Sequence, residues 1–193
     1  MTSAAALFIE SLQEHIRVVE QLRAQQDTIA RIADKIIDAL AGGRIIFWCG
    51  NGGSAADSQH LAAELVGRFQ RERDALASVA LTTDTSVLTA IGNDYGFDAV
   101  FARQVAALAR PGDILICIST SGNSPNVCAA AEKARELGVY TIALTGGDGG
   151  RLRTGADMIL SVSSLCVARV QEAHILIGHL ICDRVEAEYA IGR

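Results

Sequence analysis

The stretch that most constrains the fold of this chain is an apolar run that leads through a loop of small polar residues into a helix. Residues 114–118 are all apolar, which indicates a buried strand, and residues 119–124 read Ser-Thr-Ser-Gly-Asn-Ser. Ser124 suits the N-cap of the following helix, and Pro125 suits its first turn, where no N–H group is needed. A buried strand that continues directly into a helix is typical of a parallel sheet covered by helices.

The loop between this strand and this helix also predicts an anion site. It brings together four hydroxyl side chains, one glycine and the free N–H groups of a helix N-terminus, and phosphate is the anion that most often fills such a site. The hydroxyl residues are Ser119, Thr120, Ser121 and Ser124. Because the loop has no lysine or arginine, hydroxyl and backbone donors would hold the anion. A plain serine-rich turn is the alternative interpretation.

Strand and helix patterns alternate along most of the chain. Strands are expected at residues 45–49, 78–81, 114–118, 140–144 and 158–160, and helices at residues 55–69, 84–91, 97–108, 125–137 and 166–189. The sequence therefore predicts an α/β fold, a three-layer sandwich with a central parallel sheet of about five strands. No linker or repeat divides the chain, so residues 1–193 are expected to form one domain.

A long helical segment is expected ahead of this fold. Apolar residues recur in steps of three and four between residues 5 and 40, which predicts one or two amphipathic helices. Such a helix exposes its apolar face unless something covers it. A second subunit is the natural cover, so the sequence predicts a homo-oligomer.

Composition excludes several classes of ligand and location. The net charge of −5 argues against nucleic acid or an anionic membrane as the main partner, because either requires a basic surface. No run approaches the ~20 apolar residues that span a bilayer, and the N-terminus does not resemble a secretory signal. The five cysteines are odd in number and have no Cys-x-x-Cys spacing, which is typical of buried thiols in a reducing compartment. A cytoplasmic protein is expected.

A glycine-rich turn follows the strand at residues 45–49 and reads Gly-Asn-Gly-Gly-Ser over residues 50–54. It is not a dinucleotide fingerprint, because position 55 is not glycine and no acidic residue ends the next strand near Leu81. It also lacks the lysine of a P-loop. We interpret the glycines as allowing the backbone to close on a small ligand, with a plain tight turn as the alternative.

Two helices carry groups suited to catalysis or metal binding. His60 and Glu64 are four residues apart and share a helix face, as a divalent metal or an acid/base pair requires, although a solvated helix face has the same pattern. In the last helix, Gln171 and His179 are ~12 Å apart along the axis and ~80° apart around it. They can reach one centre through extended side chains, a bend or assembly from two chains. His174 is flanked by apolar residues, which favours a packed imidazole.

Several segments match one known family in order and spacing. They are residues 49–54, the pair His60 and Glu64, residues 92–96 (Gly-Asn-Asp-Tyr-Gly), the loop at 119–124, residues 144–146 and residues 169–174. Over nearly its whole length the chain closely resembles the sugar-isomerase (SIS) domain family, and within it the members that isomerise sedoheptulose 7-phosphate.

The resemblance implies a role for each matching residue. The implied substrate-binding residues are Asn51, Gly52, Gly53, Ser54, Glu64, Asn93, Asp94, Ser119, Thr120, Ser121, Ser124 and Gln171. The implied ligands of one zinc ion per subunit are His60, Glu64, Gln171 and His179, and Glu64 and His179 also match the family's acid/base pair. The family is usually tetrameric, with sites at subunit interfaces. Ala168 departs from members that have an aspartate there, which affects the expected sugar contacts but not the acid/base pair.

The reaction implied by the resemblance is that of an intramolecular oxidoreductase. Sedoheptulose 7-phosphate would be converted to D-glycero-D-manno-heptose 7-phosphate by proton transfer through an enediol. An isomerase of another sugar phosphate is one alternative, because the anion loop would look the same. A non-catalytic SIS-domain protein that binds the replication initiator is another. Such relatives lack the acid/base residues, so Glu64 and His179 favour the enzyme.

Overall fold

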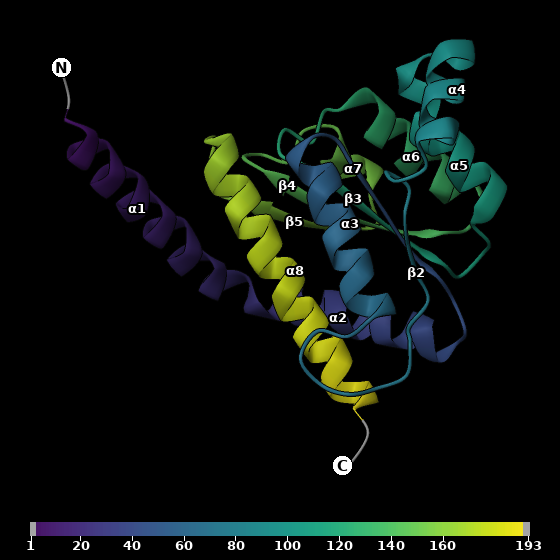
Figure 1. Cartoon of the computed structure of the whole chain (residues 1–193), viewed down its shortest axis with the longest axis horizontal. Helices are drawn as coiled ribbons and strands as arrows, with labels where there is room; N and C mark the ends of the chain where they lie inside the picture. Colours follow the sequence, from purple (N-terminus) through teal and green to yellow (C-terminus); the bar gives the residue numbers. More distant parts are fainter. Residues whose placement is uncertain (1–2, 191–193) are drawn as a thin grey trace.

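The structure, a computed structural model, describes residues 3–190 and is built around a parallel sheet (Figure 1). Its five strands are β1 (Ile46–Gly50), β2 (Ser78–Ala80), β3 (Ile114–Ser119), β4 (Tyr140–Gly146) and β5 (Met158–Val162). Their order in the sheet is β2-β1-β3-β4-β5, and every neighbouring pair is parallel. The predicted α/β fold with about five parallel strands is confirmed. Residues 1–2 and 191–193 of the predicted domain lie outside the described residues.

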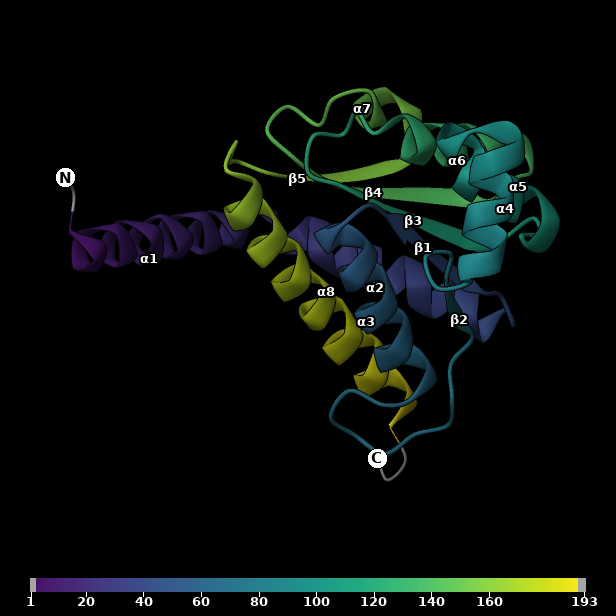
Figure 2. The same cartoon turned by 45° about the horizontal axis from the view of Figure 1, so that its top comes forward.

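Helices cover both faces of this sheet (Figures 1 and 2). One face packs against α2 (Gln26–Ala41), α3 (Gly53–Val66) and α8 (Val167–Tyr189). The other packs against α4 (Thr85–Tyr95), α5 (Val100–Leu108), α6 (Pro125–Glu136) and the short α7 (Leu152–Gly155), with the 3-10 turn η2 (Phe97–Ala99) ahead of α5. Each predicted helix is present within a few residues of its expected bounds, and α7 was not predicted.

The apolar runs that predicted the strands reflect burial on both faces. In β1, Ile46 and Trp48 belong to the core under α2, α3 and α8, whereas Phe47 and Cys49 belong to the core under α5 and α6. All five residues of β1 are buried. Because successive side chains of a strand point to opposite faces, a strand covered on both sides needs an unbroken apolar run.

The order of the strands places two loops side by side. The strands that follow β1 in the chain, β2 and β3, lie on its two sides. The direction of winding therefore changes between β1 and β3, and ligands of open α/β sheets bind at such a point, outside the carboxyl ends of the strands. The glycine-rich turn after β1 and the serine loop after β3 both lie at this end, because Gly50 pairs in register with Ile118.

The N-terminal segment forms α1 (Ala4–Gln21), the 3-10 turn η1 (Leu22–Gln25) and α2. The predicted helical segment at residues 5–40 agrees with this arrangement. Figures 1 and 2 show α1 extending away from the body of the molecule, and Phe8 and Leu12 on it are 68% and 62% exposed. Among residues 3–190, none of the helices has both the length and the apolar character needed to span a membrane.

Candidate functional site

The loops after β1 and β3 are joined by a reciprocal pair of side-chain amides. Asn51 Nδ2 donates to Asn126 Oδ1 at 2.8 Å, and Asn126 Nδ2 donates to Asn51 Oδ1 at 2.9 Å. Asn126 lies in the first turn of α6 and is 1% exposed. Asn126 is not among the predicted site residues. A polar residue directly after the helix-starting proline was the available signal, but its pairing across two loops follows only from the strand order.

The glycine-rich turn leads straight into α3. Gly52 is the N-cap residue, Gly53 and Ser54 form the first turn, and Ser54 is buried. The helix begins two residues earlier than predicted, and the N–H groups of Ser54 and Ala55 donate to the carbonyls of Asn51 and Gly52, both at 3.0 Å. The four residues Asn51, Gly52, Gly53 and Ser54 therefore lie together, next to the serine loop.

The serine loop is held in a tight conformation by its own side chains. Ser119 Oγ and Ser124 Oγ are 3.0 Å apart, and the N–H of Asn123 donates to Ser121 Oγ at 3.1 Å. Ser124 occupies the predicted N-cap position, but its hydroxyl pairs with Ser119 and makes no capping bond to α6. Pro125 has no N–H group and the N–H of Val127 donates to Asn126 Oδ1 at 3.0 Å, so the first turn of α6 offers an anion fewer donors than an uncapped helix start does.

The loop after β4 packs on the serine loop and fixes its path. The N–H of Gly146 donates to the carbonyl of Thr120 at 3.0 Å, and the N–H of Leu152 donates to that of Gly122 at 3.1 Å. Gly122 has a φ of +65°, and a methyl group added to it would overlap the carbonyl of Gly149. Glycine is required there for both its conformation and its small size.

A cavity of about 280 Å³ opens over this pair of loops. Thr120 and Ser121 line it together with Gly147, Asp148 and Ser164 from the loops after β4 and β5. Those last three residues were not among the predicted site residues, because no local pattern marks them. The cavity has the hydroxyl and backbone donors that a phosphate group needs.

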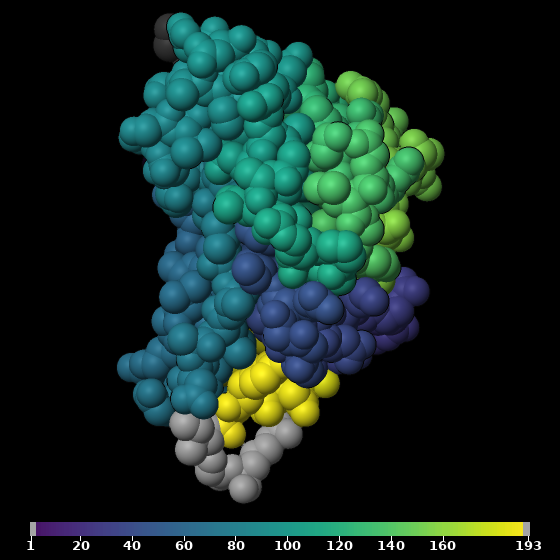
Figure 3. All heavy atoms as spheres, turned by 90° about the vertical axis from the view of Figure 1, so that its right-hand side faces the viewer, coloured from purple at the N-terminus to yellow at the C-terminus, as the bar shows by residue number. Residues whose placement is uncertain are grey.

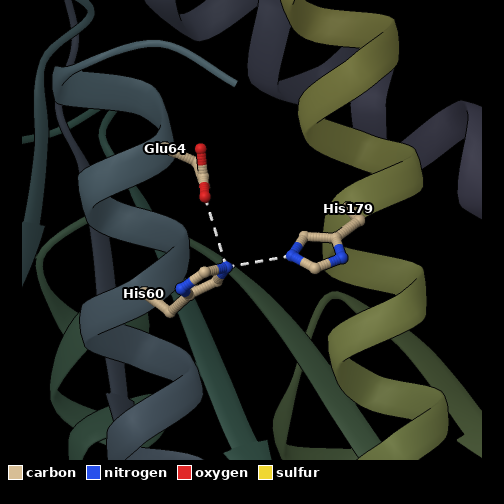
Figure 4. A group of neighbouring side chains, drawn as sticks. All are labelled: His60, Glu64 and His179. Atoms are coloured by element: carbon tan, nitrogen blue, oxygen red, sulfur yellow. Dashed lines mark hydrogen bonds and ion pairs between the residues drawn. The ribbon is translucent and has the colours of Figure 1, made fainter. Parts of the chain in front are cut away.

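A second group of polar side chains lies between α3 and α8 (Figure 4). His60 Nε2 is 3.2 Å from Glu64 Oε1 and 2.9 Å from His179 Nε2, and one possible ligand atom from each residue lies within 4.8 Å of the others. Figure 4 shows the His60 ring between the carboxylate on its own helix and the imidazole on α8. Two imidazoles and a carboxylate are a donor set that zinc accepts, and they are also a set that can move protons.

The close approach of α3 and α8 brings these residues together. The two helices run in the same direction, since Gly53 lies beside Gln171, Leu61 beside Gly178 and His60 beside His179. A methyl group added at Gly178 would overlap the Leu61 side chain, so glycine allows the helices to approach at this level. His60 is 49% exposed and Glu64 is 19% exposed, which leaves the group accessible to a ligand.

Gln171 lies apart from the other three predicted zinc ligands. Its side-chain amide contacts Gly53 at the start of α3. From Gly53 to His60 is seven residues, or about 10 Å along the helix axis. Since α8 is one continuous helix, Gln171 faces the glycine-rich turn while His179 faces His60 and Glu64.

Asn93 and Asp94 lie on α4, across the sheet from α8 (Figure 1). Both are exposed, and Asn93 Nδ2 donates to Asp94 Oδ1 at 2.7 Å. Within the described part of the chain, neither forms a hydrogen bond or ion pair with any predicted site residue outside this pair.

Two groups near the site, one half-buried and one fully buried, have altered pKa values. Burial raises the pKa of Asp57 on α3 to about 6, with a smaller opposing effect from His60, and Asp57 Oδ2 is buried without a hydrogen-bond partner. Burial lowers the pKa of His174 to about 4, although His174 Nε2 lies 3.0 Å from the carbonyl oxygen of Thr145, which acts the other way. His174 is fully buried, in agreement with its interpretation as a packed imidazole. Asp57 is not among the predicted site residues.

The chain is similar to known proteins in both sequence and structure. The family described as SIS domain matches residues 8–146. Phosphoheptose isomerase of Geobacter sulfurreducens is 58% identical over 171 residues, which cover 88% of this chain and 90% of the relative. The corresponding protein of Akkermansia muciniphila is 48% identical over 180 residues, covering 93% and 94%. The solved structure of the Neisseria gonorrhoeae phosphoheptose isomerase has a TM-score of 0.91 at 45% identity, covering 96% of this chain and 100% of that one.

Proposed function

The chain belongs to the SIS domain family and, within it, to the phosphoheptose isomerases, and we propose that it converts sedoheptulose 7-phosphate to D-glycero-D-manno-heptose 7-phosphate. The observation that carries the proposal is the meeting of Glu64 and His179. These residues come from helices far apart in the sequence, yet each has a ligand atom within 4.8 Å of the other. An isomerase that moves a proton between neighbouring carbons needs a base and a proton carrier in such proximity.

The phosphate is proposed to bind in the cavity over the serine loop. The hydroxyls of Thr120 and Ser121 line this cavity, and those of Ser119 and Ser124 belong to the same loop. All four are proposed as donors to the phosphate. Binding at this end of the sugar would hold the open chain in position for the reaction at its other end.

The length of α3 supports a long sugar as substrate. From Gly53 at the loops to Glu64 is eleven residues, about 16 Å along the axis, and helical side chains lean back toward the N-terminus, which shortens this gap. An open seven-carbon chain with its phosphate at one end suits that separation better than a short sugar does. Asn51, Gly52, Gly53 and Ser54 would then lie along its path, as would Gln171.

In the proposed reaction, Glu64 removes the proton from C1 of the ketose and returns it to C2. His179 moves protons between O1 and O2, a task suited to an imidazole because its ring nitrogens can both accept and donate a proton. The cis-enediol between the two steps is the shared intermediate of ketose and aldose. The exposed fractions of His60 and Glu64 leave room for the sugar carbons beside them.

His60, Glu64 and His179 fit one zinc ion per subunit, as their donor set indicates. When bound, the metal would polarise the sugar oxygens and stabilise the charge of the enediolate. Gln171, the fourth implied ligand, lies against Gly53. It would reach such an ion only after its side chain rearranges or if another subunit supplies it.

A homotetramer is proposed as the working form. Its support is the exposed apolar face of α1, which includes Phe8, Leu12 and Ile16. Asn93 and Asp94 are proposed to contact substrate bound to a neighbouring subunit, since in one chain they lie across the sheet from α8.

The deciding experiment is incubation with sedoheptulose 7-phosphate in deuterated water, followed by NMR of the sugar. We expect an aldose heptose 7-phosphate that carries solvent deuterium at C2, because the base exchanges its proton with water while the enediol exists. Ketose phosphates of five and six carbons serve as controls and should react more slowly. If none of the sugars acquires label and the protein instead retains purified replication initiator in a pull-down, the binding alternative replaces the isomerase.

A further inference from the structure

The segment that joins α3 to β2 is anchored by one buried carboxylate. Glu186 on α8 is 0% exposed. Its Oε1 accepts the N–H of Phe69 at 2.7 Å, and its Oε2 accepts those of Gln70 at 2.6 Å and Arg71 at 2.7 Å. Figures 1 and 2 show this segment passing around the ends of α3 and α8, and Figure 3 shows the last turns of α8 against it and against α2. Three N–H groups that converge on one carboxylate fix the path of the backbone, because each is a charge-assisted hydrogen bond.

A buried arginine completes this anchor and extends it to Glu64. The side chain of Arg73 is 0% exposed, and its Nε lies 3.7 Å from Glu186 Oε1. Arg73 Nη2 donates to the backbone carbonyl of Glu64 at 2.6 Å, and Nη1 donates to that of Gly67 at 3.1 Å. The guanidinium therefore binds one carbonyl group in the last turn of α3 and that of the C-cap residue Gly67, and carbonyls at a helix end have no partner within the helix.

The same segment reaches His179 through an aromatic ring. The ring of Phe69 stacks on the imidazole of His179, with centroids 5.2 Å apart and planes inclined by 26°. The backbone N–H of Phe69 is one of the three groups that Glu186 binds. A shift of this N–H would therefore move the surface against which the imidazole packs.

We propose that Glu186 and Arg73 are positioning residues for the acid/base pair, and that they act on His179 through Phe69 and on Glu64 through its backbone carbonyl. The inference rests on the proposed isomerase function. Both side chains are fully buried, so neither can touch the substrate. One buried ion pair would thus hold both members of the pair, which come from different helices, in fixed relation to each other.

Energetics favour positioning over stability as the reason for this ion pair. Replacing a buried ion pair by apolar side chains often leaves the free energy of unfolding unchanged or raises it. Stability alone therefore does not explain why this chain has the pair. Misplacing a reacting group by about 1 Å can reduce the rate by ~10²-fold. The alternative is that Glu186 only stabilises the fold. In that case, Glu186→Gln lowers the free energy of unfolding and leaves the NMR signals of His179 unchanged.

The first test is steady-state kinetics with sedoheptulose 7-phosphate, corrected for the fraction of folded protein. We expect Glu186→Gln and Phe69→Leu to lower kcat by roughly 10-fold to 100-fold while KM stays within about twofold, because the phosphate loops are remote from the anchor. Phe69→Tyr keeps the stacking ring and should retain kcat. The matched control is Glu188→Gln, which removes an exposed carboxylate from the same helix and breaks its ion pair with Arg184.

The second test is independent of activity and uses metal-free protein. The chain has four histidines, so a histidine-labelled NMR spectrum contains four imidazoles that His→Gln variants assign. Loss of the ring current in Phe69→Leu should shift the His179 signals, and Glu186→Gln should shift them in the same direction, whereas Glu188→Gln should leave them in place. Unchanged His179 signals in Glu186→Gln, or an unchanged kcat in that variant, would overturn the proposal.

The outcomes separate this inference from the proposed function. If the wild-type protein does not isomerise the heptose phosphate, the function fails and the position of the His179 signals still decides the positioning role. If Glu186→Gln does not fold, the comparison of Phe69→Leu with Phe69→Tyr decides it, since both keep the carboxylate. Equal kcat and equal His179 signals in those two variants would refute the role of the ring.

Discussion

The side-chain amides of Asn51 and Asn126 donate to one another, with N···O distances of 2.8 and 2.9 Å, and so tie the turn after β1 to the helix after β3. Asn126 Oδ1 also accepts the N–H of Val127 at 3.0 Å. One buried side chain therefore sets the distance between the two loops that are proposed to hold the substrate.

Replacing Asn126 by alanine should loosen both loops. We expect the free energy of unfolding to fall by about 1–3 kcal/mol, because the amide of Asn51 loses its partner, and KM for the sugar phosphate to rise. Urea unfolding and initial-rate kinetics measure the two effects. A double-mutant cycle with Asn51→Ala checks the cause, since two residues in contact should give non-additive losses. Additive losses would show that the amide pair is not the source.

The fold followed from local patterns, whereas much of the site did not. The strand at residues 114–118 and the helix after Pro125 were predicted because burial on both faces demands an apolar run and because proline and serine mark a helix start. Spacing also predicted that His60 and Glu64 share a helix face. Such signals lie within a few residues of one another and do not depend on the rest of the chain.

Contacts between distant segments left no such signal. The spacing of Gln171 and His179 allowed several arrangements, and the parallel packing of α3 on α8 separates them, with Gln171 at Gly53 and His179 at His60. Glu186 and Phe69 resemble an ordinary acidic residue and an ordinary apolar one in the sequence. Their roles depend on where the segment after α3 crosses α8, which tertiary packing alone decides.

Replacing Glu64 by glutamine should abolish most of the isomerase activity. The amide keeps the size of the side chain but cannot accept a proton from carbon, so kcat should fall by ~10² or more with little change in KM. Circular dichroism should show an intact fold, because the Glu64 side chain is 19% exposed and pairs with the exposed His60. Glu136→Gln, at an exposed carboxylate on α6, is the matched control. A wild-type rate in Glu64→Gln would remove this residue from the mechanism.

The stability of the protein should decrease in mild acid because of His174. Burial lowers its pKa to about 4, against about 6.5 in an unfolded chain, so the unfolded state binds more protons between these values. Above pH 6.5 the imidazole is neutral in both states and costs no stability. As the pH falls from 6.5 toward 4, the free energy of unfolding decreases by up to about 3 kcal/mol. His174→Gln should flatten this part of the pH profile of unfolding by urea. Asp57, whose pKa is raised to about 6, acts in the opposite sense, and comparison of the variant with the wild type cancels it. Parallel profiles would contradict the assignment.

Zinc should bind to the group of His60, Glu64 and His179 and stabilise the folded chain. At a free concentration of 100 times Kd, a ligand that binds only the folded state adds about 2.7 kcal/mol, which a thermal melt detects. Equilibrium dialysis should find one zinc ion per chain in the wild type, and a chelator should reverse the rise in Tm. His60→Gln should weaken binding, whereas His15→Gln, which removes an imidazole paired with Glu172 near α1, should leave it unchanged. Equal zinc binding by the two variants would place the ion elsewhere.

The exposed face of α1 should be an interface between subunits. Phe8, Leu12 and Ile16 recur in steps of four and are 68%, 62% and 55% exposed, so they form one apolar stripe on a helix that extends from the body. Leu12→Asp would place a carboxylate in the middle of that stripe, and burying it unpaired is costly enough to separate the subunits. Analytical ultracentrifugation should show a smaller species than the wild type, for which a tetramer is proposed. Gln13→Asp, one residue further along the same helix and outside the stripe, should leave the assembly intact. Loss of kcat in Leu12→Asp, with an unchanged circular dichroism spectrum, would indicate that each site needs a neighbouring subunit, whereas a tetramer in both variants would rule out this face as the interface.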